Sequence, residues 1–205
     1  MGVISNGTTL LDAGALNASV ATGKMILIKT LTASNSANLT FVHGASNVVL
    51  DGTYSTYVFK IINIHPITNG AFLLFNGRDG GTNYDATKQT NFLEATHNED
   101  DSAGALDNND ASDLANSTAA CRMSAAIGSG NDESANGEIK LFNPSQTTFV
   151  KKFISRISTY ESSDIAADSL MAGYFNVTAA IDGIQFSMSS GNIDSGIIKL
   201  YGMGA

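Results

Sequence analysis

The 205-residue chain has no tryptophan, one cysteine, two prolines and few charged side chains, which make up 15% of its residues. A single cysteine excludes an intrachain disulfide, so the fold depends on a buried core. A chain of this length buries about 70% of its unfolded surface, which is enough for one domain without covalent cross-links. Because a free cysteine usually behaves as a small apolar side chain, we expect Cys121 to be a buried, inert thiol.

The chain also lacks a long apolar run that could cross a bilayer. Its first residues, MGVISNGTTLLDAG, do not have the basic segment followed by an apolar one that is typical of a signal peptide. Only 11 Lys and Arg oppose 19 Asp and Glu, which gives a net charge of −8. Binding to phosphates or to an anionic membrane surface requires clustered basic side chains, so we expect no nucleic acid as partner and no membrane insertion.

Short runs of alternating apolar and polar residues, separated by Gly- and Asn-rich turns, are the dominant pattern. This pattern predicts an all-β fold, an antiparallel β-sandwich that is jelly-roll-like, with about eight to ten strands and at most one short helix. We assign residues 1–24 to an N-terminal arm or edge strand and residues 25–205 to a single sandwich domain. The clearest predicted strands are 25–31, 38–43, 56–64, 71–75, 91–97, 138–143, 147–159 and 170–178.

The C-terminal segment Asp182–Tyr201 predicts a hairpin, in which GIQFSM and GIIKLYG flank the turn-rich SSGNIDS. In the second run Ile198 and Leu200 would face the core while Lys199 faces water. The apolar residues Ile197 and Tyr201 would share the outer face with Lys199. A partly apolar outer face favours burial against another subunit, so we predict that Ile197, Lys199 and Tyr201 form an interface between copies.

The sequence also contains two similar stretches. The SGN turn at 129–131 precedes GEIKLF at 137–142, and the SGN turn at 190–192 precedes GIIKLY at 196–201. The similarity has three explanations that the sequence leaves open: an ancient duplication, two equivalent strands in a pseudo-symmetric sandwich, or coincidence.

Three segments have patterns that are harder to interpret. Residues 98–113, NEDDSAGALDNNDASD, form the most acidic stretch and predict a long surface loop or a mobile excursion. Residues 114–127 are rich in alanine, and we expect a short helix there, capped near Ser112 or Asp113. The long run 147–159 places lysines among apolar residues on both faces, which suggests a bend or a β-bulge within the strand.

Metal binding has one weak candidate in the acidic segment. Asp107, Asn109 and Asp113 offer side-chain oxygens at alternating positions, a spacing that suits calcium. The segment lacks the glycine and the distal glutamate of an EF-hand, so a solvated acidic loop is the favoured interpretation. The three histidines, His43, His65 and His97, are not in a two-ligand spacing, and we expect neither metal nor cofactor.

Catalysis has no clear candidate residues either. Glu94, Glu99 and Asp100 could in principle provide the two carboxylates of a glycoside hydrolase, but any acidic protein offers such candidates. The chain has no G-x-S-x-G elbow and no phosphate-binding loop, so we expect that it is not an enzyme. Carbohydrate binding is the better alternative, with Tyr54 and Tyr84 as possible glycan contacts and Tyr160 as a further loop tyrosine, although tryptophan is absent.

Three stretches carry a resemblance to a known group: GNDESANGEIKLFNPSQTTFVKKF, MAGYFN with the following IDGIQFSMSSGNIDSGIIKLYG, and TYVFKIINIHP. Over residues 25–203 they resemble small virion structural proteins of tailed bacteriophages, especially marine ones. The short sequences at 143–145 and 189–193 are the most specific parts of this resemblance.

The resemblance implies a non-catalytic protein of the virion, assembled in the host cytoplasm, such as a tail-fibre, tail-tip or head-decoration component. Its expected partners are other copies, with a trimer as the first expectation, and other phage virion proteins. A host-surface glycan is the partner expected in the alternative, a carbohydrate-binding module for adsorption to the host surface.

Overall fold

The computed structural model describes residues 3–5, 8–12, 15–16 and 25–204. In the predicted N-terminal arm, the described residues form a three-stranded sheet of their own, in the order β1-β2-β3. Its strands are β1 (Val3–Ser5), β2 (Thr8–Asp12) and β3 (Ala15–Leu16). The remainder of the arm, including residues 17–24, lies outside the described residues.

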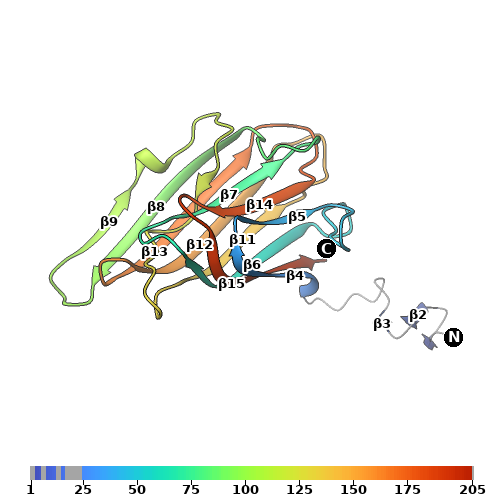
Figure 1. The fold of residues 1–205 in the computed structure, drawn as a ribbon. Helices are drawn as coiled ribbons and strands as arrows, with labels where there is room; N and C mark the ends of the chain where they lie inside the picture. The colour runs from blue at the N-terminus through green and yellow to red at the C-terminus, as the bar shows by residue number, and fades with distance from the viewer. Residues whose placement is uncertain (1–2, 6–7, 13–14, 17–24, 205) are drawn as a thin grey trace.

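Residues from Met25 onward form two antiparallel sheets packed against each other, as the predicted all-β sandwich requires (Figure 1). The larger sheet has eight strands, which are, in spatial order, β4 (Met25–Ser36), β15 (Ile193–Met203), β6 (Thr56–Pro66), β11 (Ala135–Phe142), β12 (Lys151–Glu161), β13 (Ile165–Phe175), β8 (Lys88–Asn98) and β9 (Gly104–Asn108). The smaller sheet has four, β10 (Cys121–Arg122), β7 (Leu73–Arg78), β14 (Gly183–Met188) and β5 (Asn38–Val42).

The connections follow jelly-roll order. The chain passes from β4 in the larger sheet to β5 in the smaller, then back to β6 and again to β7, and β15 finally lies between β4 and β6. The predicted C-terminal hairpin is therefore wrong, because β14 and β15 belong to different sheets. Alternation along each run identified the two strands correctly, but it carries no information on their partners, and both strands have two other neighbours.

The strand β12 shows how the sequence pattern produces this architecture. Its residues alternate strictly between buried and exposed, and it pairs with β11 and β13 without a register shift, so the predicted bulge is absent. A lysine on the core-facing side of β12 explains why the sequence mixes lysines with apolar residues on both faces. Lys151 is fully buried, and its Nζ donates a hydrogen bond of 2.8 Å to the carbonyl of Val177.

Six phenylalanine rings form the centre of the core between the sheets. Three come from the larger sheet and three from the smaller, and all are fully buried: Phe59, Phe153, Phe175, Phe41, Phe75 and Phe186. Neighbouring rings have centroid distances of 5.0–6.3 Å with mostly edge-to-face or tilted geometry. This arrangement joins the sheets through shape-specific aromatic contacts as well as buried area.

The sheets contain more strands than the eight to ten expected, because two short strands lie where the sequence indicated other structures. Part of the acidic segment forms β9, which pairs with β8, and a 3₁₀ turn, η1 (Asp110–Ser112), follows. The predicted helix at 114–127 is wrong. Cys121, Met123, Ala125 and Ile127 are buried at every second position, and β10 pairs with β7, so tertiary packing overrides the helix propensity of the alanines.

The two similar stretches of sequence occupy equivalent places. Their strands, β11 and β15, lie on either side of β6, and both run antiparallel to it. In each strand the lysine lies between a fully buried isoleucine and a fully buried leucine and points to the opposite face. These residues are Ile139, Lys140 and Leu141 in β11, and Ile198, Lys199 and Leu200 in β15. The similarity therefore corresponds to two equivalent strands, which either a duplication or convergence on the same environment would produce.

Candidate functional site

The outer face of the larger sheet is the surface most suited to binding. Strand register places side chains there in rows that cross the strands. One row runs through Leu93, Leu170, Arg156, Glu138, Lys60 and Lys199. The next runs through Asn91, Ala172, Ile154, Lys140, Val58 and Tyr201. The face thus combines apolar and charged positions contributed by six strands.

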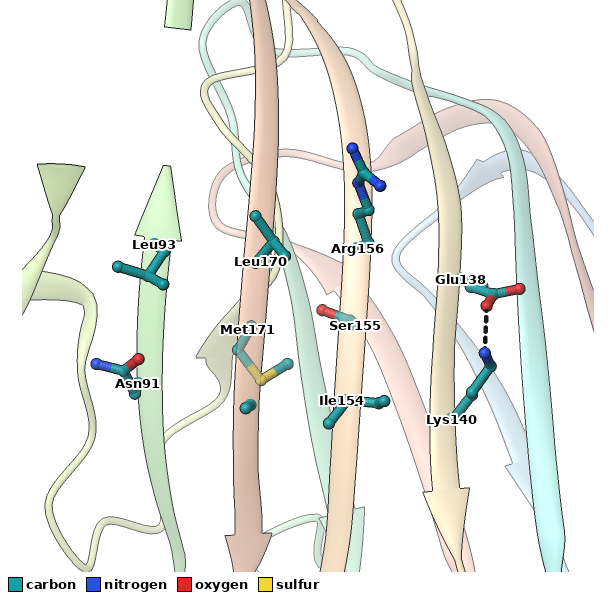
Figure 2. A pocket seen from close by; sticks show the side chains of 10 residues that line it. Asn91, Leu93, Glu138, Lys140, Ile154, Ser155, Arg156, Leu170 and Met171 are labelled. Carbon is teal, nitrogen blue, oxygen red and sulfur yellow. Dashed lines mark ion pairs between the residues drawn. The ribbon is translucent and has the colours of Figure 1, made fainter. Parts of the chain in front are cut away.

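A shallow hollow of about 460 Å³ lies in this face, over β8, β13, β12 and β11. Figure 2 shows its apolar members, Leu93, Leu170 and Ile154, on three neighbouring strands. They are 37%, 40% and 46% exposed, which is unusual for large apolar side chains in the middle of a sheet. An apolar depression that remains open to solvent is typical of a surface that binds another molecule.

Charged side chains form the rim of the hollow. Glu138 lies between two lysines, pairing with Lys60 and, at 2.9 Å, with Lys140. The hydrogen bonds from Lys60 and then Lys140 lower the pKa of Glu138, so this carboxylate remains ionised. Arg156 forms a two-pronged contact with Asp168, with a closest distance of 2.7 Å.

The three predicted interface residues lie on this same face. Ile197, Lys199 and Tyr201 are half-buried on β15, opposite Ile62, Lys60 and Val58 of β6. At the adjoining margin the exposed Met25, Leu27 and Met203 extend the apolar area. The structure therefore groups the sequence-predicted positions with the hollow as parts of one surface, and their role as an interface stays a prediction.

The smaller sheet differs in this respect. None of the exposed large apolar side chains of the described residues belongs to its four strands. Partial exposure there falls on polar residues such as Thr40, Gln185 and Ser187, and on the apolar Val42 and Leu74. Among the strands of the two sheets, strongly exposed large apolar side chains thus belong to the larger sheet.

The calcium candidates do not converge in one place. Asp107 lies on β9 opposite Glu94, while Asn109 precedes η1 and Asp113 follows it. One carboxylate oxygen of Asp113 accepts a hydrogen bond of 2.7 Å from the amide of Phe92, so it fixes the loop to β8. Among the described residues, no three His, Cys, Asp or Glu side chains are arranged to hold a metal ion.

The tyrosines considered as glycan contacts are engaged in packing. The ring of Tyr54 lies edge-to-face with that of Tyr57, with centroids 5.8 Å apart, and covers Gly202. Tyr84 is half-buried beside Gly183. Its pKa is raised, because burial outweighs the opposing effect of Arg78. Tyr160 is the penultimate residue of β12, with its hydroxyl 3.5 Å from Asp164. Packing thus holds the rings of Tyr54 and Tyr84, and their role as glycan contacts stays a prediction.

The histidines and candidate acids are also dispersed. His43 accepts a hydrogen bond from the amide of Leu50, His65 contacts Asp194 at 3.4 Å, and His97 contacts Asp101 at 3.2 Å. Glu94 is the least exposed of the three candidate acids, and it pairs with Arg122 at 2.9 Å. Glu99 and Asp100 lie at the tip of the β8–β9 hairpin, on the wall of a separate polar hollow.

Sequence reasoning did not identify the hollow, although it did predict part of the pattern. The alternation of side chains along the predicted strand 147–159 places Ile154 and Arg156 on one face and Phe153 on the other. The other members, Leu93 and Leu170, come from strands distant in sequence, and the register that aligns them appears only in the folded sheet.

No protein-family model, curated protein or solved structure matches this chain. The described residues contain no helix that is long and apolar enough to cross a membrane.

Proposed function

We propose that this protein is a non-catalytic structural component of a tailed-phage virion, used as a tail-fibre, tail-tip or head-decoration protein. In this proposal it acts by binding copies of itself and other virion proteins through the outer face of the larger sheet, and it is located in the virion. The virion assignment depends on the sequence resemblance, and the binding mode depends on the structure.

The observation that supports binding is the cluster of exposed apolar side chains on the outer face of the larger sheet. Leu93, Ile154 and Leu170 line a hollow whose rim holds charges already paired with one another. Paired charges around an apolar centre are the usual composition of a protein-binding surface, with a desolvated core and a polar rim. Such a surface binds through burial and shape, and requires no chemical step.

Carbohydrate binding in host adsorption remains the second proposal. Its best remaining candidate is Tyr84, beside the ion pair in which Arg78 contacts Asp182 at 2.8 Å. Aromatic rings next to charged hydrogen-bonding groups are suited to sugars. Saturable binding to host polysaccharide that is weakened by Tyr84→Ala would favour this function.

The virion assignment can be tested directly by mass spectrometry of purified particles, followed by a map of the particle. We expect the chain at a fixed ratio to the other virion proteins, within an ordered part of the particle. Absence of the chain from purified particles would exclude the proposal. Release of reducing ends from a host glycan by the purified chain would instead identify a hydrolase.

A further inference from the structure

The outer face of the larger sheet is divided across its strands into an apolar part and a charged part. Two neighbouring rows of side chains, at the end of the sheet where β4 begins, form the apolar half. Their large apolar and aromatic members are Leu27, Tyr201 and Ile154 in one row, and Met25, Phe142 and Tyr174 in the other. Only Lys140 and Lys152 in these rows are charged, whereas the next row contains Arg156, Glu138 and Lys60.

The rest of the chain that the structure describes leaves the apolar half uncovered. Met25, Leu27 and Ile154 are exposed, and the hollow lies where the apolar half meets Leu93 and Leu170. The two rows cross seven strands, from β4 to β8, which is a length of roughly 30 Å. Exposed apolar side chains over such a length are typical of a surface that binds another molecule.

The N-terminal sheet of β1, β2 and β3 has a matching composition. Its strands contain five large apolar residues and one charged residue, Asp12. The register places Val3 opposite Leu11 and Leu11 opposite Leu16, so three of the apolar residues form one row. Ile4 is 64% exposed. A sheet this small does not bury its apolar residues without a second layer, so it requires another surface to pack on.

The chain connects this small sheet directly to the apolar half. β4 begins at Met25, which is itself a member of the apolar half. The eight residues between Leu16 and Met25 can span at most roughly 30 Å, so the small sheet stays close to this end of the sandwich. Figure 1 shows β2 and β3 beyond the body of the sandwich, on the side where β4 begins, and not over the larger sheet of the same chain.

We propose that the N-terminal sheet of each copy packs on the apolar half of a neighbouring copy. Because the small sheet extends away from its own outer face, the face that it covers belongs to another chain. Each copy gives one sheet and accepts one, so a pair or a closed ring such as the expected trimer satisfies the contact. This inference rests on the proposed binding role of the face, and it names the segment that occupies it.

The charges on and around the apolar half are compatible with this contact. Lys140 is paired with Glu138 at 2.9 Å, and Arg156 is paired with Asp168. Lys152 is exposed and can extend its ammonium group into water while its aliphatic stem covers apolar surface. Packing of a nearly uncharged sheet therefore buries apolar area without leaving an ionised group unpaired in the contact.

Association should be measured by sedimentation over a range of concentrations. We expect the unmodified chain to form an oligomer. Deletion of residues 1–24 should give a folded monomer, because both sheets of the sandwich and its core consist of residues from Met25 onward. In the full chain, Ile154→Asp and Leu11→Asp should each raise the dissociation constant at least tenfold, since each places a charge in an apolar contact.

The matched control is Ile67→Asp, which should leave association unchanged. Ile67 is also exposed, but it lies in the loop after β6, at the opposite end of the strand from the apolar half. Circular dichroism of each variant, matching that of the unmodified chain, would show that the fold is retained.

A mixing experiment tests whether the sheet of one copy packs on the face of another. The chain that lacks residues 1–24 keeps the face, and the Ile154→Asp variant keeps the N-terminal sheet. We expect each to be monomeric alone and the mixture to form a one-to-one complex. Native mass spectrometry would identify this complex, because the two chains differ in length.

Three results would overturn the proposal. The first is an unmodified chain that is monomeric at all concentrations, and the second is a chain without residues 1–24 that associates as well as the unmodified one. The third is association that Ile154→Asp does not weaken, which would place the contact away from the apolar half. The virion proposal would survive all three, since it is decided by whether the chain occurs in purified particles.

Discussion

At the scale of single residues, buried charges in this protein are compensated in two ways. Lys88 and Lys151 are fully buried and donate hydrogen bonds to backbone carbonyls, with Lys88 reaching Ala119 at 2.7 Å. Burial lowers the pKa of both amines. Arg122 is instead paired with a carboxylate and held between two aromatic rings. Removing a partner in either case leaves a polar group without its hydrogen bonds, which is more costly than losing a surface contact.

Replacing Arg122 with alanine should strongly destabilise the fold. The guanidinium carbon lies 4.0 Å from the ring centroid of Phe72 and 4.9 Å from that of Phe92, and the group pairs with the largely buried Glu94. We expect a loss of about 3–5 kcal/mol in the free energy of unfolding, measured by urea titration, because Glu94 would remain buried without a partner.

The matched control for Arg122 is Arg156→Ala, whose side chain is 71% exposed. Removing that exposed ion pair should lower stability far less than removing Arg122, because solvent screens exposed charges. Equal losses for the two variants would contradict the importance assigned to the buried site.

The thiol of Cys121 should resist alkylation while the protein is folded. Burial raises its pKa to about 12, and the sulfur lies 3.3 Å from the carbonyl oxygen of Phe75. Since the thiolate is the reactive form, iodoacetamide at pH 8 should leave the native chain unmodified in a mass spectrum, and should label it fully in urea. Rapid labelling of the native protein would show that this part of the core opens.

Glu138→Gln should reveal a pH-dependent contribution to stability. The folded pKa of Glu138 is lowered by its two lysine partners, so its contribution is present above the usual carboxyl pKa and is lost as pH falls through the lowered value. The variant should be less stable at pH 7 by up to about 1 kcal/mol, given its partial exposure. The difference should become smaller as the pH falls, which urea titrations at pH 7 and pH 3 would measure.

At the scale of elements, the sequence predicted strands well and partners poorly. Alternation predicted β5 and β14, because in a strand with one buried face every second side chain is apolar. The hairpin assigned to β14 and β15 was wrong, since local turn chemistry says nothing about which sheet receives the next strand. The candidate surface is harder still to predict, because Leu93 and Leu170 become neighbours only through the register in which β8 pairs with β13.

Gly173→Ala should test how closely the strands approach one another in β13. An added Cβ would lie 2.4 Å from the carbonyl oxygen of Gln89 and 2.8 Å from the ring of Phe153, so backbone or core must shift. We expect a loss of about 1–3 kcal/mol by thermal or urea unfolding. Gly52→Ala is the control, because its nearest neighbour, Ser145 Oγ, is 4.0 Å away and no loss from overpacking is expected.

At the scale of the whole molecule, the jelly-roll order joins distant parts of the chain. Among the described residues, β15 is the only partner of β4, and it also separates β4 from β6. It contributes Ile193, Ile198 and Leu200, all fully buried, to the core. The early part of the sandwich is therefore completed by the last of its strands.

Deletion of residues 192–205 should consequently unfold the whole sandwich, and not only remove one strand from it. We expect loss of the β-sheet circular dichroism signal and rapid digestion by a protease at sites throughout the chain. Deletion of only the final two residues is the control, because nothing lies within 4 Å of a side chain added at Gly204. A protease-resistant body in the longer deletion would show that the other strands fold without β15.

The place of β15 has a consequence for biosynthesis. A ribosome releases β4 long before it has made the strand that pairs with it, so the nascent polypeptide carries an incomplete sheet until β15 has been synthesised. Polypeptides that terminate early therefore lack the row through Lys199 and Tyr201, and with it part of the surface proposed to join copies. If the outer face joins copies as proposed, synthesis of the complete sandwich would be a condition for that association.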